Sequence, residues 1–325
     1  MIEPRPPFDR ELDLVIATMP VEAPTSYGPE ELRLRRERIR QTWPSLESLI
    51  AGRDIEHVEM NARGVSDGAD LRFSILRPRV RRPHSDCMYS IHGGGLTRGD
   101  RFTWTVHAPH WVTKFGLTLI SVEYRLAPDH PHPAPVDDCL RGLSWVVDNA
   151  DALDIDPRRI LLGGASAGGG LAAATALLAR DFGGPSLLGL MLKSPMLDDR
   201  NATISSRQFS ATPGWNRELN VWAWRAMLGD AVGGSDVSPY AAPARAQDLS
   251  RLPTTFIDVG SAEVFRDEAV EFASRIWAAG GEAELHVWPG GFHGFEEWAP
   301  SSALTTDARE ASDRWIGRAL ESGAQ

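Results

Sequence analysis

The sequence contains little cysteine: only Cys87 and Cys139 among 325 residues. Two thiols make neither a disulfide framework nor a cysteine-based metal cluster. Both lie in segments with an apolar pattern, so we expect buried free thiols. No group of His, Cys, Asp or Glu residues has the spacing typical of metal ligands, and we expect no metal site.

Long apolar runs are also absent, and clusters of positive charge, such as the one in residues 34–40, are few. No run reaches the ~18 residues that a membrane-spanning helix needs. Residues 1–10 are polar and proline-rich, unlike a signal peptide. The formal net charge is −10, which disfavours nucleic acids and anionic membranes as partners because both attract clustered Lys and Arg. The basic run 34–40 alternates with apolar residues at helical spacing, which favours a solvated helix face. We therefore expect a soluble, cytoplasmic protein with neither kind of partner.

The chain is long enough for one large α/β domain or two small ones, and its 42% hydrophobic content is ordinary. From residue 87 onward, β-prone and helical segments alternate, which predicts an α/β fold with a mostly parallel sheet and helices on both faces. The turn at Asp67 and Gly68 predicts that the first two strands form an antiparallel hairpin. The expected strands are 56–62, 71–77, 87–91, 117–122, 160–163, 188–193, 254–259 and 283–288.

Two segments depart from this alternation. Residues 1–53 are expected to form separate N-terminal helices, and residues 198–234 interrupt the pattern after a strand. Because open α/β sheets bind ligands at that edge, both segments could form a cap over a site. The alternative is that the aromatic residues of 198–234 only fill a core. The α/β domain under this cap is then expected to consist of two stretches of the chain, residues 54–197 and 235–325.

The segment around Ser166 has the form G-x-S-x-G, from Gly164 to Gly168. A short apolar stretch precedes it and an Ala- and Leu-rich stretch follows, so Ser166 is expected where a buried strand turns sharply into a helix. Small flanking residues suit the crowding at such a turn. The Ala167 N–H would then lie at the helix N-terminus, where it could hold an oxyanion. Without this context the pattern could be an ordinary glycine-rich turn.

A serine nucleophile needs a base and a group that orients the base. His293 lies just past the last expected strand in a loop with neighbouring glycines, and we expect it to be the base. His286 lies inside that strand and is expected to be structural. Three carboxylates near the expected strand 254–259 are candidates for the orienting acid: Asp258, Glu263 and Asp267. Glu263 is preferred because it lies in the loop at the end of the strand, and acid before histidine is the hydrolase order.

The segment from His92 to Gly95, HGGG, follows another buried strand. Consecutive glycines let bare backbone approach a substrate, and two N–H groups can point at one oxygen. A flexible turn is the alternative. His92 is expected to shape this loop by hydrogen bonding rather than to transfer protons.

The chain resembles the hormone-sensitive-lipase-like carboxylesterases of the α/β-hydrolase superfamily. The resemblance runs from about residue 85 to 297 and rests on the segments 92–95, 124–128, 133–138, 164–169, 265–268 and 293–295. It implies an α/β-hydrolase fold with an eight-stranded sheet and a helical cap, and hydrolysis of short to medium acyl esters without a cofactor. It also implies an oxyanion hole made by the N–H groups of Gly93, Gly94 and Ala167, and a possible homodimer.

The chain departs from the family pattern at two positions. Ala165 stands where the family often has Asp, which could change how the serine turn is supported. Glu263 stands where the triad acid is usually Asp, and other α/β-hydrolases use Glu in this role.

The sequence thus predicts a serine carboxylesterase that acts on a small-molecule ester through Ser166, Glu263 and His293. Trp215, Trp222 and Phe209 are candidates for lining its substrate pocket, since such pockets are mostly apolar and aromatic. A lactonase or an amidase could use the same groups. A small-molecule receptor on this fold is a further alternative, and the presence of His293 argues against it.

Overall fold

A central eight-stranded sheet runs through the computed structural model, which describes residues 4–21, 28–66, 68–103 and 107–322. The strand order across this part of the chain is β1-β2-β4-β3-β5-β6-β7-β8. β2 pairs antiparallel with β1 and β4, and the other neighbours are parallel. The strands are β1 (Ile55–Ser66), β2 (Ala69–Pro78), β3 (Ser85–Ile91), β4 (Thr118–Glu123), β5 (Ile155–Ala165), β6 (Gly189–Lys193), β7 (Thr255–Gly260) and β8 (Ala283–Trp288). The mostly parallel sheet is confirmed, and Asp67 of the expected hairpin turn lies outside the described residues.

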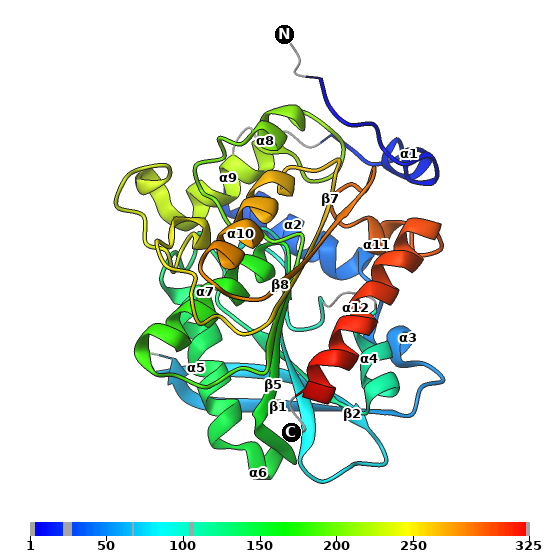
Figure 1. Cartoon of the computed structure of the whole chain (residues 1–325), viewed down its shortest axis with the longest axis vertical. Coiled ribbons are helices and arrows are strands. Elements are labelled where there is room, and N and C mark those ends of the chain that lie inside the picture. Colours follow the sequence, from blue (N-terminus) through cyan, green and yellow to red (C-terminus); the bar gives the residue numbers. More distant parts are fainter. Residues whose placement is uncertain (1–3, 22–27, 67, 104–106, 323–325) are drawn as a thin grey trace.

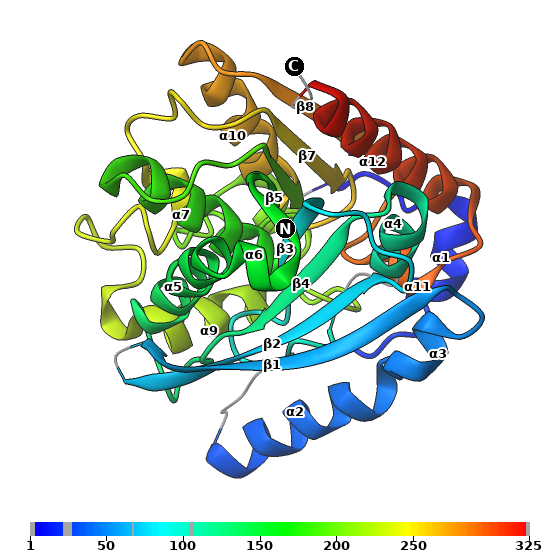
Figure 2. The same ribbon diagram turned by 90° about the horizontal axis from the view of Figure 1, so that it is seen from below.

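Helices cover both faces of the sheet, as Figure 2 shows. One face carries α5 (Ala134–Asp148), α7 (Ala167–Phe182) and α10 (Arg266–Ala278), and the other carries α4 (Ala108–Phe115) and α12 (Ala303–Ser322). The interior strands β6 and β7 are almost continuously apolar, as is typical of parallel strands buried on both faces. α4 begins at Ala108, and residues 104–106 before it lie outside the described part.

The helix after the serine turn follows from its composition. α7 is rich in Ala and Leu, which are strong helix formers, and it is buried along most of its length. It ends at Gly183, whose φ of 68° is the left-handed conformation that favours glycine at a helix C-terminus. A rigid helix therefore begins directly at the nucleophile candidate.

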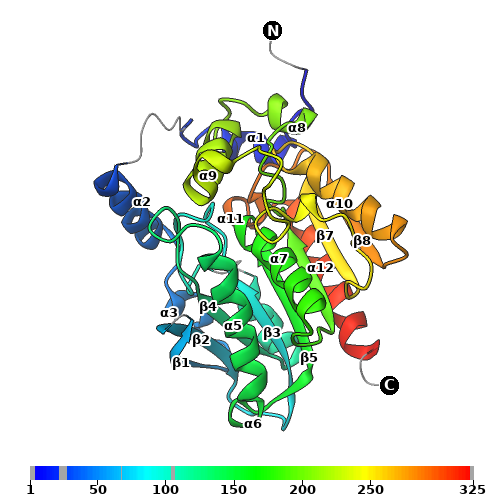
Figure 3. The ribbon, with the colours of Figure 1, turned by 90° about the vertical axis from the view of Figure 1, so that its left-hand side faces the viewer.

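Most of the remaining α-helices lie at one end of the sheet, and α6 (Ala150–Leu153) lies at the opposite end (Figures 1 and 3). The others are α1 (Arg10–Ile16), α2 (Pro29–Thr42), α3 (Leu46–Ile50), α8 (Ile204–Gln208), α9 (Arg217–Leu228) and α11 (Phe295–Trp298). The N-terminal segment contacts the 198–234 segment: the rings of Phe8 and Phe209 are 6.4 Å apart, and the Gly214 N–H donates to the Pro20 carbonyl. The two segments that depart from the βα alternation therefore pack together.

Two expectations from composition can be compared with the structure. Cys87 and Cys139 are both buried free thiols, as expected. Within the described residues, every helix is too short or too polar to cross a membrane.

Candidate active site

Ser166 occupies a strained turn between β5 and α7. Its φ of 57° and ψ of −123° are unusual for a residue with a side chain. The turn is held by its neighbours: the Ser166 N–H donates to the Lys193 carbonyl at 2.8 Å, and the Ser166 carbonyl accepts from the Met196 N–H at 3.0 Å. A Cβ on Gly164 would lie 2.1 Å from the Gly168 carbonyl oxygen, so the turn requires glycine there. The expected strand–turn–helix geometry is confirmed.

Ser166, His293 and Glu263 form one continuous line of hydrogen bonds. The distance from Ser166 Oγ to His293 Nε2 is 3.0 Å, and that from His293 Nδ1 to Glu263 Oε2 is 2.5 Å. Glu263 is only 1% exposed. Its other oxygen, Oε1, accepts from Ser194 Oγ at 2.7 Å and from the Gly260 N–H at 2.9 Å. These three contacts hold the Glu263 carboxyl group in one orientation. When His293 Nδ1 carries the hydrogen and donates it to Glu263, His293 Nε2 has a lone pair that can accept the Ser166 proton.

The other two acid candidates have different partners. Asp258 accepts from Lys193 Nζ at 2.8 Å and from Trp288 Nε1 at 3.3 Å. Asp267 accepts from the Ser205 N–H at 2.7 Å and pairs with Arg266. The structure therefore brings only Glu263 of the three candidates to the His293 imidazole.

The loop that begins at His92 lies directly against the serine turn. A Cβ on Gly93 would lie 2.9 Å from the Ala165 carbonyl oxygen and 3.3 Å from Ser166 Cβ, so the close approach needs glycine. His92 is buried, stacks on Tyr124 at 4.2 Å, and donates from Nδ1 to the Gly93 carbonyl at 2.8 Å. Because the peptide unit is planar and trans, fixing the Gly93 carbonyl also fixes the opposite direction of the Gly94 N–H. His92 thus shapes the loop, as expected.

The N-terminal segment supports the same loop from outside. Arg36 of α2 donates to the Thr97 carbonyl at 2.8 Å and to the Ala127 carbonyl at 3.2 Å. The Ala127 N–H in turn donates to the Leu96 carbonyl at 3.0 Å. α2 is therefore tied to the chain that follows the glycines, a contact that the sequence did not reveal.

The three aromatic residues suggested for the pocket have different environments. Trp215 reaches the site: its ring centroid lies 6.2 Å from that of His293, and a Cβ on Gly95 would lie 2.3 Å from the indole. Trp222 is partly buried against the main core. Phe209 is 1% exposed with its ring against Phe8, so packing accounts for it. Trp224, also in 198–234, is buried in the core.

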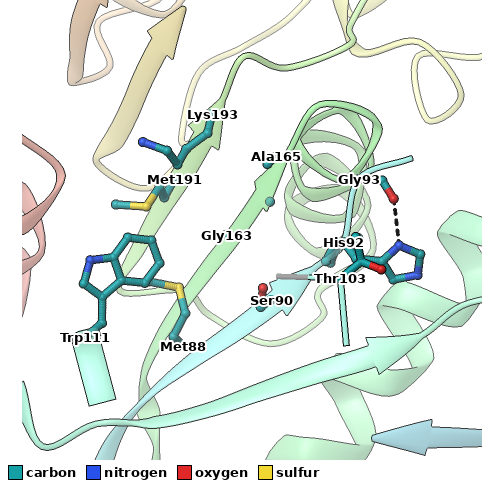
Figure 4. A pocket seen from close by; sticks show the side chains of 12 residues that line it. Met88, Ser90, His92, Gly93, Thr103, Trp111, Gly163, Ala165, Met191 and Lys193 are labelled. Carbon is teal, nitrogen blue, oxygen red and sulfur yellow. Dashed lines mark hydrogen bonds between the residues drawn. The ribbon is translucent and has the colours of Figure 1, made fainter. Parts of the chain in front are cut away.

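A small cavity of about 30 Å³ lies beside the serine turn, on the sheet face that carries α4 (Figure 4). Gly93 and Ala165 form its wall next to the turn, and Met88, Met191 and Trp111 make much of it apolar. About 10–15 Å³ suffices for one water molecule, so the cavity has room for only a few heavy atoms.

One group of side chains in the described part of the chain has the donors of a metal site. It consists of His107, His110 and Asp313, which sequence spacing could not reveal because Asp313 is far along the chain. The Asp313 carboxylate already accepts from both histidines, from Trp111 Nε1 at 3.0 Å and from Lys114 Nζ at 2.8 Å. Burial opposes ionisation of Asp313, but these donors outweigh it and hold its pKa below the usual range. The protein's own hydrogen-bond donors thus occupy the carboxylate oxygens that a metal would need.

We therefore expect chelators to leave the ester hydrolysis that the sequence predicts unchanged. The reaction that the Ser166 site can perform needs a nucleophile, a base, a carboxylate that orients the base, and N–H donors for the oxyanion. None of these is a metal. The measurement is the initial rate before and after dialysis against EDTA. A loss that a divalent ion restores would contradict this expectation, and a His110→Ala variant would show whether the His107 group is responsible.

A buried ionic group next to the site was missed by the sequence reasoning. Lys193 lies at the end of β6 and contacts Asp258 and Glu296, all three nearly buried. The available signal was a lone lysine ending an otherwise apolar strand, because a buried lysine requires anionic partners.

Comparisons with known proteins agree with this architecture. A family model described as alpha/beta hydrolase fold matches residues 88–297. Carboxylesterase NlhH of Mycobacterium tuberculosis is 32% identical over 318 residues, which cover 94% of this chain and 96% of the relative. Among solved structures, a bacterial heroin esterase has a TM-score of 0.88 at 33% identity, with 96% and 98% of the chains covered. Esterase LipW from Mycobacterium marinum has a TM-score of 0.84 at 30% identity, with 97% and 98% covered.

Proposed function

Because this chain belongs to the α/β-hydrolase family and is a carboxylic ester hydrolase, we propose that Ser166, His293 and Glu263 are its catalytic triad. The observation that carries the proposal is the line of hydrogen bonds from Ser166 Oγ through His293 to Glu263, with lengths of 3.0 and 2.5 Å. That arrangement provides a nucleophile, a base and a group that orients the base.

In the proposed reaction, His293 Nε2 accepts the Ser166 proton as Oγ attacks the ester carbonyl. The N–H groups of Gly93, Gly94 and Ala167 stabilise the oxyanion, and Glu263 stabilises the imidazolium. His293 then gives its proton to the leaving alcohol, and an acyl-enzyme forms on Ser166. In the second half, His293 takes a proton from water, the resulting hydroxide attacks the acyl-enzyme, and Ser166 regains its proton as the acid leaves.

A single assay tests this function. Hydrolysis of p-nitrophenyl acetate is measured with and without prior treatment with an organophosphate, which reacts with an activated serine. We expect turnover that the treatment abolishes, with the phosphoryl group found on Ser166 by mass spectrometry. Binding of esters without turnover would instead indicate a receptor. Repeating the assay with lactones and with anilides would show whether the protein prefers either of them to esters.

We further propose that the preferred esters carry short acyl chains. Because the leaving oxygen must lie near His293 Nε2, we propose that the acyl group lies on the side of Ser166 away from His293, near Gly93 and the cavity that Gly93 lines. That cavity is small, and Trp215 packs over Gly95 on the other side of the loop. Each buried methylene contributes about 0.8 kcal/mol only while a pocket can receive it.

The expected result is a kcat/KM that stops rising early in a series of soluble p-nitrophenyl esters from acetate to dodecanoate. Trp215→Ala should move the optimum to longer chains, whereas Trp277→Ala, which removes a half-exposed tryptophan on α10, should not. A kcat/KM that climbs past about ten carbons contradicts a closed pocket, by the same methylene increment.

The residues 1–53 and 198–234 are proposed to form the cap of this site. Their mutual contacts and the position of Trp215 beside His293 support this division. The homodimer and the cytoplasmic location stay predictions, and light scattering on the purified protein and fractionation of cells would test them.

A further inference from the structure

The residues Lys193 and Ser194, at the end of β6, contact all three segments that carry the proposed triad. The Lys193 carbonyl accepts the Ser166 N–H at 2.8 Å. The Ser194 hydroxyl donates to Glu263 Oε1 at 2.7 Å. The Lys193 ammonium lies 2.9 Å from Glu296 Oε1, three residues after His293. One dipeptide therefore meets the nucleophile turn, the acid and the base-bearing loop.

The Lys193 side chain is almost completely enclosed. It is 7% exposed, and its Nζ also donates to Asp258 at 2.8 Å and to Ser312 Oγ at 3.1 Å. Burial by itself would lower the pKa of Lys193, but the two carboxylates outweigh it and hold that pKa above its ordinary value. All three donor directions of the ammonium are thus used, which fixes the side chain in one position.

This buried group holds one ammonium and two carboxyl groups, and burial raises the pKa of Glu296. Lys193 and Asp258 alone form a neutral buried pair, so Glu296 adds a second carboxylate to one ammonium. A buried ion pair is a weak source of stability because desolvation offsets the attraction. Through its contact with Lys193, Glu296 links β6 to α11. α11 begins two residues after His293.

We propose that Lys193 is a positioning residue that holds the His293 loop, through Glu296, in line with Ser166. His293 is carried by a loop after the edge strand β8, which pairs with β7 alone in the described sheet. Lys193 belongs to the interior strand β6, whose carbonyl also fixes the serine turn. Contacts with Lys193 therefore set the positions of both Ser166 and His293.

The test uses Glu296→Leu, which cuts the link and leaves the neutral Lys193–Asp258 pair. We expect kcat for p-nitrophenyl acetate to fall about tenfold with KM nearly unchanged, since small misplacements of a catalytic group cost up to about 10²-fold. The low-field proton resonance of His293 Nδ1–H should broaden or shift. Glu296→Gln keeps an oxygen for Lys193 and should retain most of the activity.

Ser312→Ala is the matched control, because it removes another Lys193 contact, on α12, without touching the His293 loop. It should lower the unfolding temperature and reduce kcat clearly less than Glu296→Leu does. If Glu296→Leu does not fold, the charge-free triple variant Lys193→Met, Asp258→Asn, Glu296→Gln replaces it, with the same loss in kcat expected. Wild-type kcat in either variant, or equal losses in Glu296→Leu and Ser312→Ala, overturns the proposal. Organophosphate labelling of Ser166 in each variant separates this outcome from a failure of the serine mechanism.

Discussion

Ser166→Ala is expected to abolish ester hydrolysis while the protein stays folded. The Oγ that lies 3.0 Å from His293 Nε2 is the only atom removed, and no backbone contact of the turn depends on it. Because the triad acts as a unit, loss of the nucleophile typically costs about 10⁶-fold in kcat. The measurement is kcat with p-nitrophenyl acetate, with circular dichroism as the check on folding.

The same variant can also test binding. Its KM cannot be measured without turnover, so the affinity for a substrate ester is measured by calorimetry instead. Ser166→Ala should still bind the ester, since the N–H donors and Trp215 are untouched. Hydrolysis by this variant within about tenfold of the wild type would refute Ser166 as nucleophile, given the loss that a triad predicts.

Glu263→Gln is expected to give the second largest loss, on the order of 10⁴ in kcat, as for the analogous change in another serine hydrolase. The structure gives the reason. Glu263 Oε1 accepts from Ser194 and Gly260, so the amide oxygen of Gln takes that position and its NH₂ faces His293. His293 Nδ1 must then accept rather than donate, which puts the proton on Nε2, where it blocks deprotonation of Ser166.

Two further variants define the role of this carboxylate. Glu263→Asp should also be poor, because a shorter side chain cannot span from the same backbone position to His293 Nδ1 while keeping the Ser194 contact. Asp267→Asn is the control: its carboxylate accepts from the Ser205 N–H, so we expect lower stability and nearly normal kcat. Equal losses in Glu263→Gln and Asp267→Asn would argue against a specific role for Glu263.

The sequence was sufficient where chemistry is encoded locally. The glycines around Ser166 and in the 92–95 loop mark close backbone approaches, and such approaches exclude every side chain, so the residue type alone carries the information. The mostly parallel sheet also followed from the alternation of β-prone and helical segments. Glu263 was preferred from its position at the end of a strand, and the structure places its carboxylate against His293.

Where the sequence fell short, the missing information was the identity of distant partners. Phe209 and Trp215 belong to the same aromatic segment, yet one packs against Phe8 and the other reaches His293. Apolar character suits a core and a pocket equally, so periodicity could not separate them. The contact of Lys193 with Glu296 likewise depends on which elements meet at the end of the sheet, which no local pattern specifies.

The backbone of Ser166 has a consequence for how this protein would respond to engineering. A side chain held at φ 57° and ψ −123° typically costs about 1–3 kcal/mol relative to a residue that adopts this conformation freely. Glycine is such a residue, so a screen for heat resistance alone would reward Ser166→Gly and discard the chemistry. Thermostability and turnover are therefore opposed at this position, and any search for robust variants must score both at once.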